Sequence, residues 1–165
     1  MRSTIKIVIL LFFICTSMSG ASFPDMEKYM RQHALIWEQL PMQWNEGAFL
    51  GNGLVGMMVY ADSTLNALVF HLGRPDVTDH RKAPYRKTSI GTEEADKMVD
   101  FCRLDVGKML LFPEGKILSG TFYLDIYNAE LTGHLKTDKG DLTFHAYTPQ
   151  PEEVNIVEVS SGVPY

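Results

Sequence analysis

The chain has 165 residues, a net charge of −5 and 45% hydrophobic residues, enough to build one domain around an apolar core. This acidic balance argues against nucleic acid or an anionic membrane as a partner, because both are negatively charged. The 2 cysteines and 5 histidines show no paired ligand spacing, so we expect no structural zinc site, no other metal and no cofactor.

Residues 1–21 have the pattern of a secretory signal peptide. Arg2 and Lys6 precede the apolar run 7–14, and Ser19-Gly20-Ala21 supplies the small residues of a cleavage site. The run is shorter than the roughly 20 apolar residues that a transmembrane helix needs. We therefore expect an exported protein, periplasmic or extracellular, that does not insert into a membrane.

The two cysteines bear on this prediction. Lipidation at Cys15 is an alternative to cleavage, but Phe12, Phe13 and Ile14 lack the small residue expected before a lipidated cysteine. After cleavage Cys102 would be alone and unable to form an internal disulfide. A small buried apolar residue is favoured there over a reactive thiol.

Residues 25–40 carry apolar side chains at three- and four-residue intervals. Asp25 is placed as an N-cap and Pro41 as a stop. The spacing predicts an amphipathic helix, at least as far as His33.

A glycine-rich turn follows at Gly51-Asn52-Gly53. A turn that cradles a phosphate should open a helix, whereas β-prone residues follow here, so nucleotide binding is disfavoured. Residues 54–60 and 65–72 are two apolar runs separated by Ala61-Asp62-Ser63-Thr64, which predicts an antiparallel hairpin.

Residues 73–91 are polar and contain prolines, so we expect a long ordered loop. Four residues in or beside it could bind a metal or act as acid and base: His71, Asp76, Asp79 and His80. A structural loop is favoured, in which Arg74 and Arg81 pair with the aspartates.

In the second half of the chain, the spacing of the apolar residues changes from a helical to a strand-like period. Residues 92–103 predict a short helix that begins at Thr92, after which apolar and polar residues alternate around Phe122 and Leu124. Asp138-Lys139-Gly140 predicts a turn, and 155–160 a last strand that leaves an unfinished sheet edge. Residues 22–165 therefore predict one mainly β domain, an incomplete antiparallel β-sandwich with one or two short helices.

Several aromatic residues could stack on sugars, although large aromatics more often fill cores. They are Trp37, Trp44, Tyr60, Tyr85, Tyr123, Tyr127 and Tyr147. Glu46 could be a catalytic carboxylate, but glycosidases need a second carboxyl group roughly 5 to 10 Å away, so we assign no catalytic residue.

Four blocks of sequence resemble the N-terminal domain of glycoside hydrolase family 95, the α-L-fucosidase-like secreted proteins. The blocks are Trp44-Asn45-Glu46 with Leu50-Gly51-Asn52-Gly53-Leu54-Val55-Gly56, then 71–81, 103–108 with 115–117, and 124–130. The resemblance extends over most of residues 27–162.

The resemblance implies a non-catalytic N-terminal domain or fragment of a secreted glycosidase of plant or host polysaccharides. In this family an antiparallel sandwich precedes a catalytic (α/α)6 barrel. The resemblance stops before such a barrel begins, so we expect the chain alone to be inactive. The barrel would be its partner, and the parent enzyme would bind the oligosaccharide or polysaccharide. We expect these residues at the rim of the glycan site: Trp44, Asn52, Arg74, Asp76, Asp79, His80 and Arg81. Two alternatives are a free-standing carbohydrate-binding sandwich and a metal-dependent hydrolase.

Overall fold

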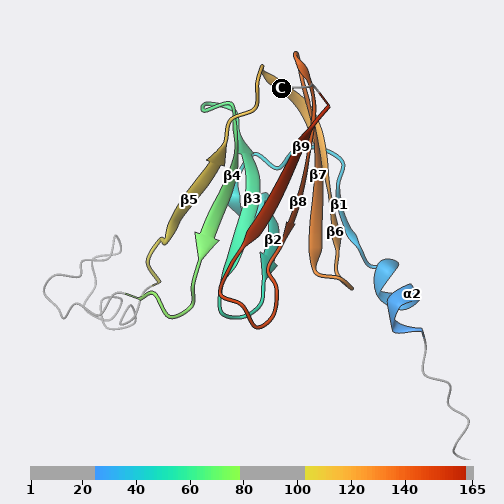
Figure 1. Cartoon of the computed structure of the whole chain (residues 1–165), viewed down its shortest axis with the longest axis vertical. Coiled ribbons are helices and arrows are strands. Elements are labelled where there is room, and N and C mark those ends of the chain that lie inside the picture. The colour runs from blue at the N-terminus through green and yellow to red at the C-terminus, as the bar shows by residue number, and fades with distance from the viewer. Residues whose placement is uncertain (1–24, 79–102, 163–165) are drawn as a thin grey trace, which may run out of the picture.

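The computed structural model describes residues 25–78 and 103–162, which form two antiparallel β-sheets packed face to face (Figure 1). This arrangement confirms the predicted partial β-sandwich. No helix within the described ranges is long and apolar enough to cross a membrane. The predicted signal peptide and Cys102 lie outside the described residues, as does all of the predicted 92–103 helix except Arg103.

The first sheet has the order β2-β3-β4-β5. Its strands are β2 (Ala48–Gly51), β3 (Gly56–Asp62), β4 (Ala67–Gly73) and β5 (Gly107–Leu111). The second sheet has the order β1-β6-β7-β8-β9. Its strands are β1 (Leu35–Trp37), β6 (Ile117–Asp125), β7 (Glu130–Thr137), β8 (Gly140–Tyr147) and β9 (Ile156–Ser161).

Three phenylalanines form the centre of the core between the sheets. Phe144 of β8 contacts Phe70 of β4 and Phe122 of β6 edge to face, with ring centroids 5.5 and 5.4 Å apart. The Phe144 ring lies directly over Gly133 of β7, where any Cβ would overlap it. The predicted alternation of apolar and polar residues around Phe122 and Leu124 is confirmed, because these two side chains face the core while Tyr123 faces outward.

The helix predicted over residues 25–40 is wrong beyond its first turns. Helix α2 spans Met26–Arg31, is capped by Asp25 and buries none of its residues. The chain then becomes extended, because Leu35 and Trp37 pair with Leu124 and Phe122 of β6. Pairing with β6 and the packing of Trp37 against the core outweigh the helical spacing of these side chains.

Both predicted hairpins exist, but the first turns later than predicted. The Asp62 carboxylate accepts hydrogen bonds from the backbone N–H groups of Thr64 and Leu65 at 2.8 and 3.1 Å, and Asn66 has a φ of 52°. The turn is thus formed after Asp62, which itself pairs with Ala67. The β7–β8 turn lies at Asp138 and Lys139, as predicted.

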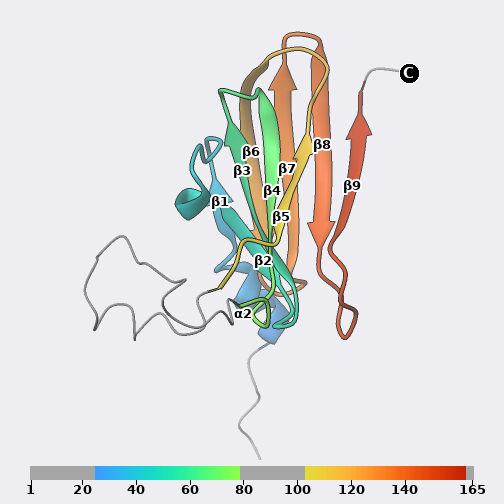
Figure 2. The same ribbon diagram turned by 90° about the vertical axis from the view of Figure 1, so that its left-hand side faces the viewer.

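One side of the sandwich is open. β5 and β9 are the edge strands there, and among the described residues neither has a further partner strand (Figure 2). Met109 of β5 and Val159 of β9 face the interior, yet each is 43% exposed. β9 is therefore the edge strand that the sequence predicted.

Candidate functional site

A groove of about 720 Å³ lies at the end of the first sheet where β2 meets β3 and β4 ends. Phe49, Met58 and His71 are register neighbours on β2, β3 and β4 and form part of its lining. Trp44, Arg74 and Asp105 line it from the adjoining segments. Three stretches that are distant in sequence thus meet in one groove.

Trp44 is presented to solvent by a short 3-10 helix, η1 (Trp44–Glu46). The indole N–H of Trp37, whose ring packs against the core, donates to the Glu46 carbonyl at 2.9 Å. Gly47 lets this turn lie against β3, since a Cβ there would be 2.8 Å from the Val59 carbonyl oxygen. The Trp44 side chain remains 62% exposed, so its ring is available for stacking.

Asn52 holds the β2–β3 turn rather than offering its amide to a ligand. Its carboxamide oxygen accepts from the N–H groups of Leu54 and Val55 at 3.0 and 3.1 Å. Its NH₂ group donates to the carbonyls of Pro149 and Glu152 at 2.8 and 2.7 Å. The residue therefore joins the turn to the loop between β8 and β9.

Arg74 is held at the end of β4 by two carboxylates. Its guanidinium makes a bidentate pair with Asp76, with both N–O distances at 2.9 Å, and a further bond of 2.6 Å to Glu153. The hydrogen bond from Arg74 lowers the pKa of Asp76, and the same bond raises the pKa of Arg74. The ionic pairing predicted within this loop is therefore present for Arg74 and Asp76.

A second pair in the groove was not predicted. His71 Nε2 lies 2.9 Å from Asp105 Oδ1, which also accepts the Gly107 N–H at 3.0 Å. The hydrogen bond with His71 is the main cause of the lowered pKa of Asp105. The two residues are 34 positions apart, and only the pairing of β4 with β5 brings them together. Knowledge of that strand pairing would have been needed to find it.

The predicted rim residues thus divide into three groups. Trp44 and Arg74 line the groove, whereas Asn52 supports its turn and Asp76 binds Arg74. Asp79, His80 and Arg81 lie outside the described residues. Within residues 25–78 and 103–162, no three His, Cys, Asp or Glu side chains are placed to hold a metal ion.

Two described carboxylates at the groove, Asp76 and Asp105, are held ionised by basic partners. A glycosidase acid keeps its proton because its pKa is raised, whereas Asp76 and Asp105 both have lowered pKa values and stay ionised. Glu46 is exposed on η1. The exposed rings of Trp44 and Phe49 beside fixed charges resemble the apolar and polar mixture of a small-molecule site.

No protein-family model matches the chain, and no curated protein matches it significantly.

Proposed function

We propose that this chain is the N-terminal, non-catalytic sandwich domain of a secreted glycoside hydrolase that resembles family 95 and acts on plant or host polysaccharides. Export by the N-terminal segment and a downstream helical barrel as partner belong to the same proposal. The domain binds part of a glycan at the rim of the catalytic site and does not cleave it.

One observation carries this proposal: three of the resembling blocks converge on the groove. Trp44 comes from the first block, His71 and Arg74 from the second, and Asp105 from the third. An exposed indole supplies a flat apolar face for sugar C–H groups, and charged side chains can bond to hydroxyl groups.

The first experiment is a hydrolysis assay of residues 22–165 on aryl glycosides. We expect no turnover, because the proposal assigns cleavage to the downstream barrel and because the carboxylates Asp76 and Asp105 have lowered pKa values, unlike a glycosidase acid. Turnover that survives repurification would contradict the proposal.

The second experiment is calorimetric titration with plant and host oligosaccharides. We expect weak binding, with a Kd of about 1 mM, that Trp44→Ala reduces at least about tenfold. The Trp44 side chain is 62% exposed, so Trp44→Ala should keep its thermal unfolding midpoint. Unchanged glycan binding in this variant would show that the groove is not the glycan-binding site.

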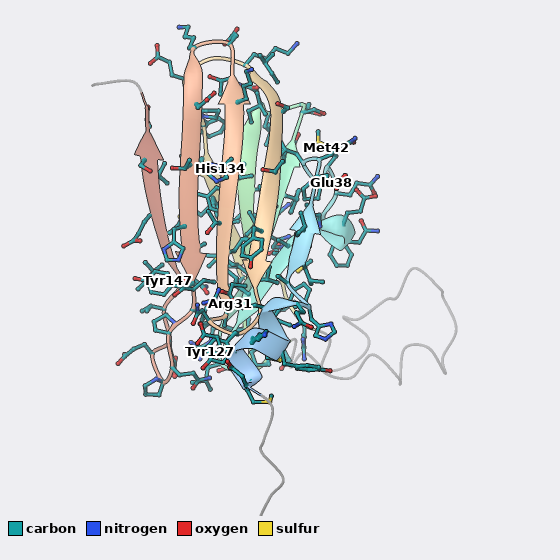
Figure 3. The ribbon with its side chains drawn as sticks, turned by 90° about the vertical axis from the view of Figure 1, so that its right-hand side faces the viewer. Arg31, Glu38, Met42, Tyr127, His134 and Tyr147 are labelled. Atoms are coloured by element: carbon teal, nitrogen blue, oxygen red, sulfur yellow. The ribbon has the colours of Figure 1, made fainter. Side chains whose placement is uncertain are left out.

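The runner-up is a free-standing carbohydrate-binding module that uses the outer face of the second sheet. This face is polar with scattered aromatic rings, and Figure 3 shows His134 on β7 with Tyr147 and Tyr127 nearer the α2 end. Tyr123, 38% exposed, lies on the same face beside Thr132. Loss of glycan binding in Tyr123→Ala but not in Trp44→Ala would favour this candidate.

A further inference from the structure

The turn between β2 and β3 contains the Asn52-Gly53 step, the one Asn-Gly pair in the sequence. In such a step the glycine nitrogen can attack the asparagine carboxamide, because no Cβ shields that nitrogen. Gly53 is exposed, and a Cβ added to it would meet no atom within 4 Å. The attacking group therefore lies at an open surface.

The folded chain holds the other reactant, the Asn52 carboxamide, at both of its ends. Its oxygen accepts from two N–H groups of the same turn, and its NH₂ group donates to the carbonyls of Pro149 and Glu152 at 2.8 and 2.7 Å. The side chain of Gln150 also donates to the Asn52 carbonyl. The NH₂ group has to leave as ammonia during deamidation, so its two bonds to the loop 148–155 must break first.

The loop 148–155 between β8 and β9 is held against the first sheet by side chains of its own. Figures 1 and 2 both show this loop beside the β2–β3 turn. Glu153 pairs with Arg74 at 2.6 Å, and Asn155 donates to the Gly56 carbonyl at 3.5 Å. The side chains of Arg74 and Glu153 are 30% and 55% exposed, so loss of their pair loosens the loop without stranding a buried charge.

We propose that Asn52 is a deamidation site and that opening of the loop 148–155 limits its reaction. While the loop is closed, the carboxamide keeps its bonds and the residue is preserved. When the loop opens, the Gly53 nitrogen loses its proton to water and bonds to Cγ of Asn52, and Nδ2 takes up a proton and leaves as ammonia. Water then opens the succinimide at either carbonyl and gives aspartate or isoaspartate, with no oxidation or reduction.

The product cannot hold the loop as asparagine does. A carboxylate has acceptor oxygens only, so an oxygen takes the place of the NH₂ donor. That oxygen would face the carbonyl oxygens of Pro149 and Glu152, and both hydrogen bonds to the loop are lost. Deamidation therefore converts a closed loop into one that no longer closes in the same way.

The test follows the conversion of Asn52 in the purified full chain by peptide mass spectrometry at mildly alkaline pH, with and without urea. We expect conversion at least about tenfold faster in the unfolded chain, because the folded chain reacts only through its open state. Glu153→Gln should speed the reaction of the folded chain about two- to fivefold, since it removes one exposed ion pair. Glu152→Gln is the matched control, because it makes the same charge change in the same loop while Glu152 bonds to Asn52 through its backbone carbonyl. It should leave the rate unchanged.

Asn52→Asp reproduces one product and tests its effect on the loop. Amide hydrogen exchange of the loop 148–155 should be faster in this variant, while exchange of β7 stays the same. Three results would overturn the proposal: equal conversion of Asn52 in the folded and unfolded chain, equal rates in Glu153→Gln and Glu152→Gln, or unchanged exchange of the loop in Asn52→Asp.

Discussion

Asp125 connects the N-terminal helix to the sandwich through a single carboxylate. It accepts the N–H groups of Tyr127 and Asn128 at 2.9 and 3.2 Å and pairs with Arg31 of α2 at 2.7 Å. Burial alone would raise the pKa of Asp125, but these hydrogen bonds and the Arg31 charge outweigh it and lower the pKa. The residue is 7% exposed, so its bonds are poorly replaced by water.

We expect Asp125→Ala to lower the free energy of unfolding by about 2 to 3 kcal/mol at pH 7, because the turn loses its acceptor. A carboxylate with a lowered folded pKa stabilises the fold above its unfolded pKa of 3.8, and this contribution is lost as pH falls through the folded pKa. Urea unfolding measures both effects. Arg31→Ala is the control and should cost clearly less, since the turn bonds remain and the Arg31 side chain is partly exposed. Equal losses in both variants would refute the central role of the turn.

Gly133 shows how one missing Cβ fixes the core. We expect Gly133→Ala to lower the free energy of unfolding by about 1 to 3 kcal/mol, because Phe144 has to leave its position against β7. Gly73→Ala is the matched control, since a Cβ at Gly73 meets no atom within 4 Å. Thermal or urea unfolding that is the same in both variants would contradict this packing.

At the scale of elements, an ionic contact across three strands adds to the backbone pairing that holds β9 to β8. His145 of β8 places Nδ1 3.1 Å from Glu158 of β9 and Nε2 3.3 Å from Glu130 of β7. Only the imidazolium can donate from both nitrogens. The hydrogen bond to Glu158, then that to Glu130, raises the pKa of His145 against the effect of burial.

The raised pKa predicts a pH dependence of β9. Stabilisation by His145 is fully present below its unfolded pKa of 6.5 and is lost as pH rises through the higher folded pKa. Amide hydrogen exchange of 156–161, corrected for intrinsic rates, should therefore show weaker protection above this pKa. Glu158→Gln should lower the His145 pKa measured by NMR, and a pKa that stays unchanged would exclude the contact. Thr143→Val, which removes only the 2.6 Å bond to Ser160, should leave the His145 titration intact.

How far the sequence predicts these elements depends on the range of the interactions that form them. The β3–β4 and β7–β8 hairpins follow from local alternation and turn chemistry, so they were predictable within a few residues. The sequence predicts helix at β1, and this prediction is wrong because the conformation of β1 is set by pairing with β6, 87 residues away at Ile36 and Tyr123. The same holds for the groove, where Trp44 and Arg74 could be named from sequence but the His71–Asp105 contact could not.

At the scale of the whole molecule, the described residues combine a buried core, an open side between the edge strands β5 and β9, and a groove at one end of the first sheet. The core packs between the two sheets, η1 presents Trp44 to solvent beside it, and Asp105 in the groove has a lowered pKa because of its hydrogen bond with His71. In the proposed role, this domain binds sugar at the rim of the catalytic site, and a partner domain cleaves it.

NMR titration of ¹⁵N-labelled residues 22–165 with plant and host oligosaccharides tests this role at the level of single residues. We predict that an oligosaccharide shifts the indole N–H resonance of Trp44 and the amides of 71–74, while the sugar stays intact in the proton spectrum. Shifts confined to the Tyr123 face, or products of glycoside cleavage in the same tube, would contradict it.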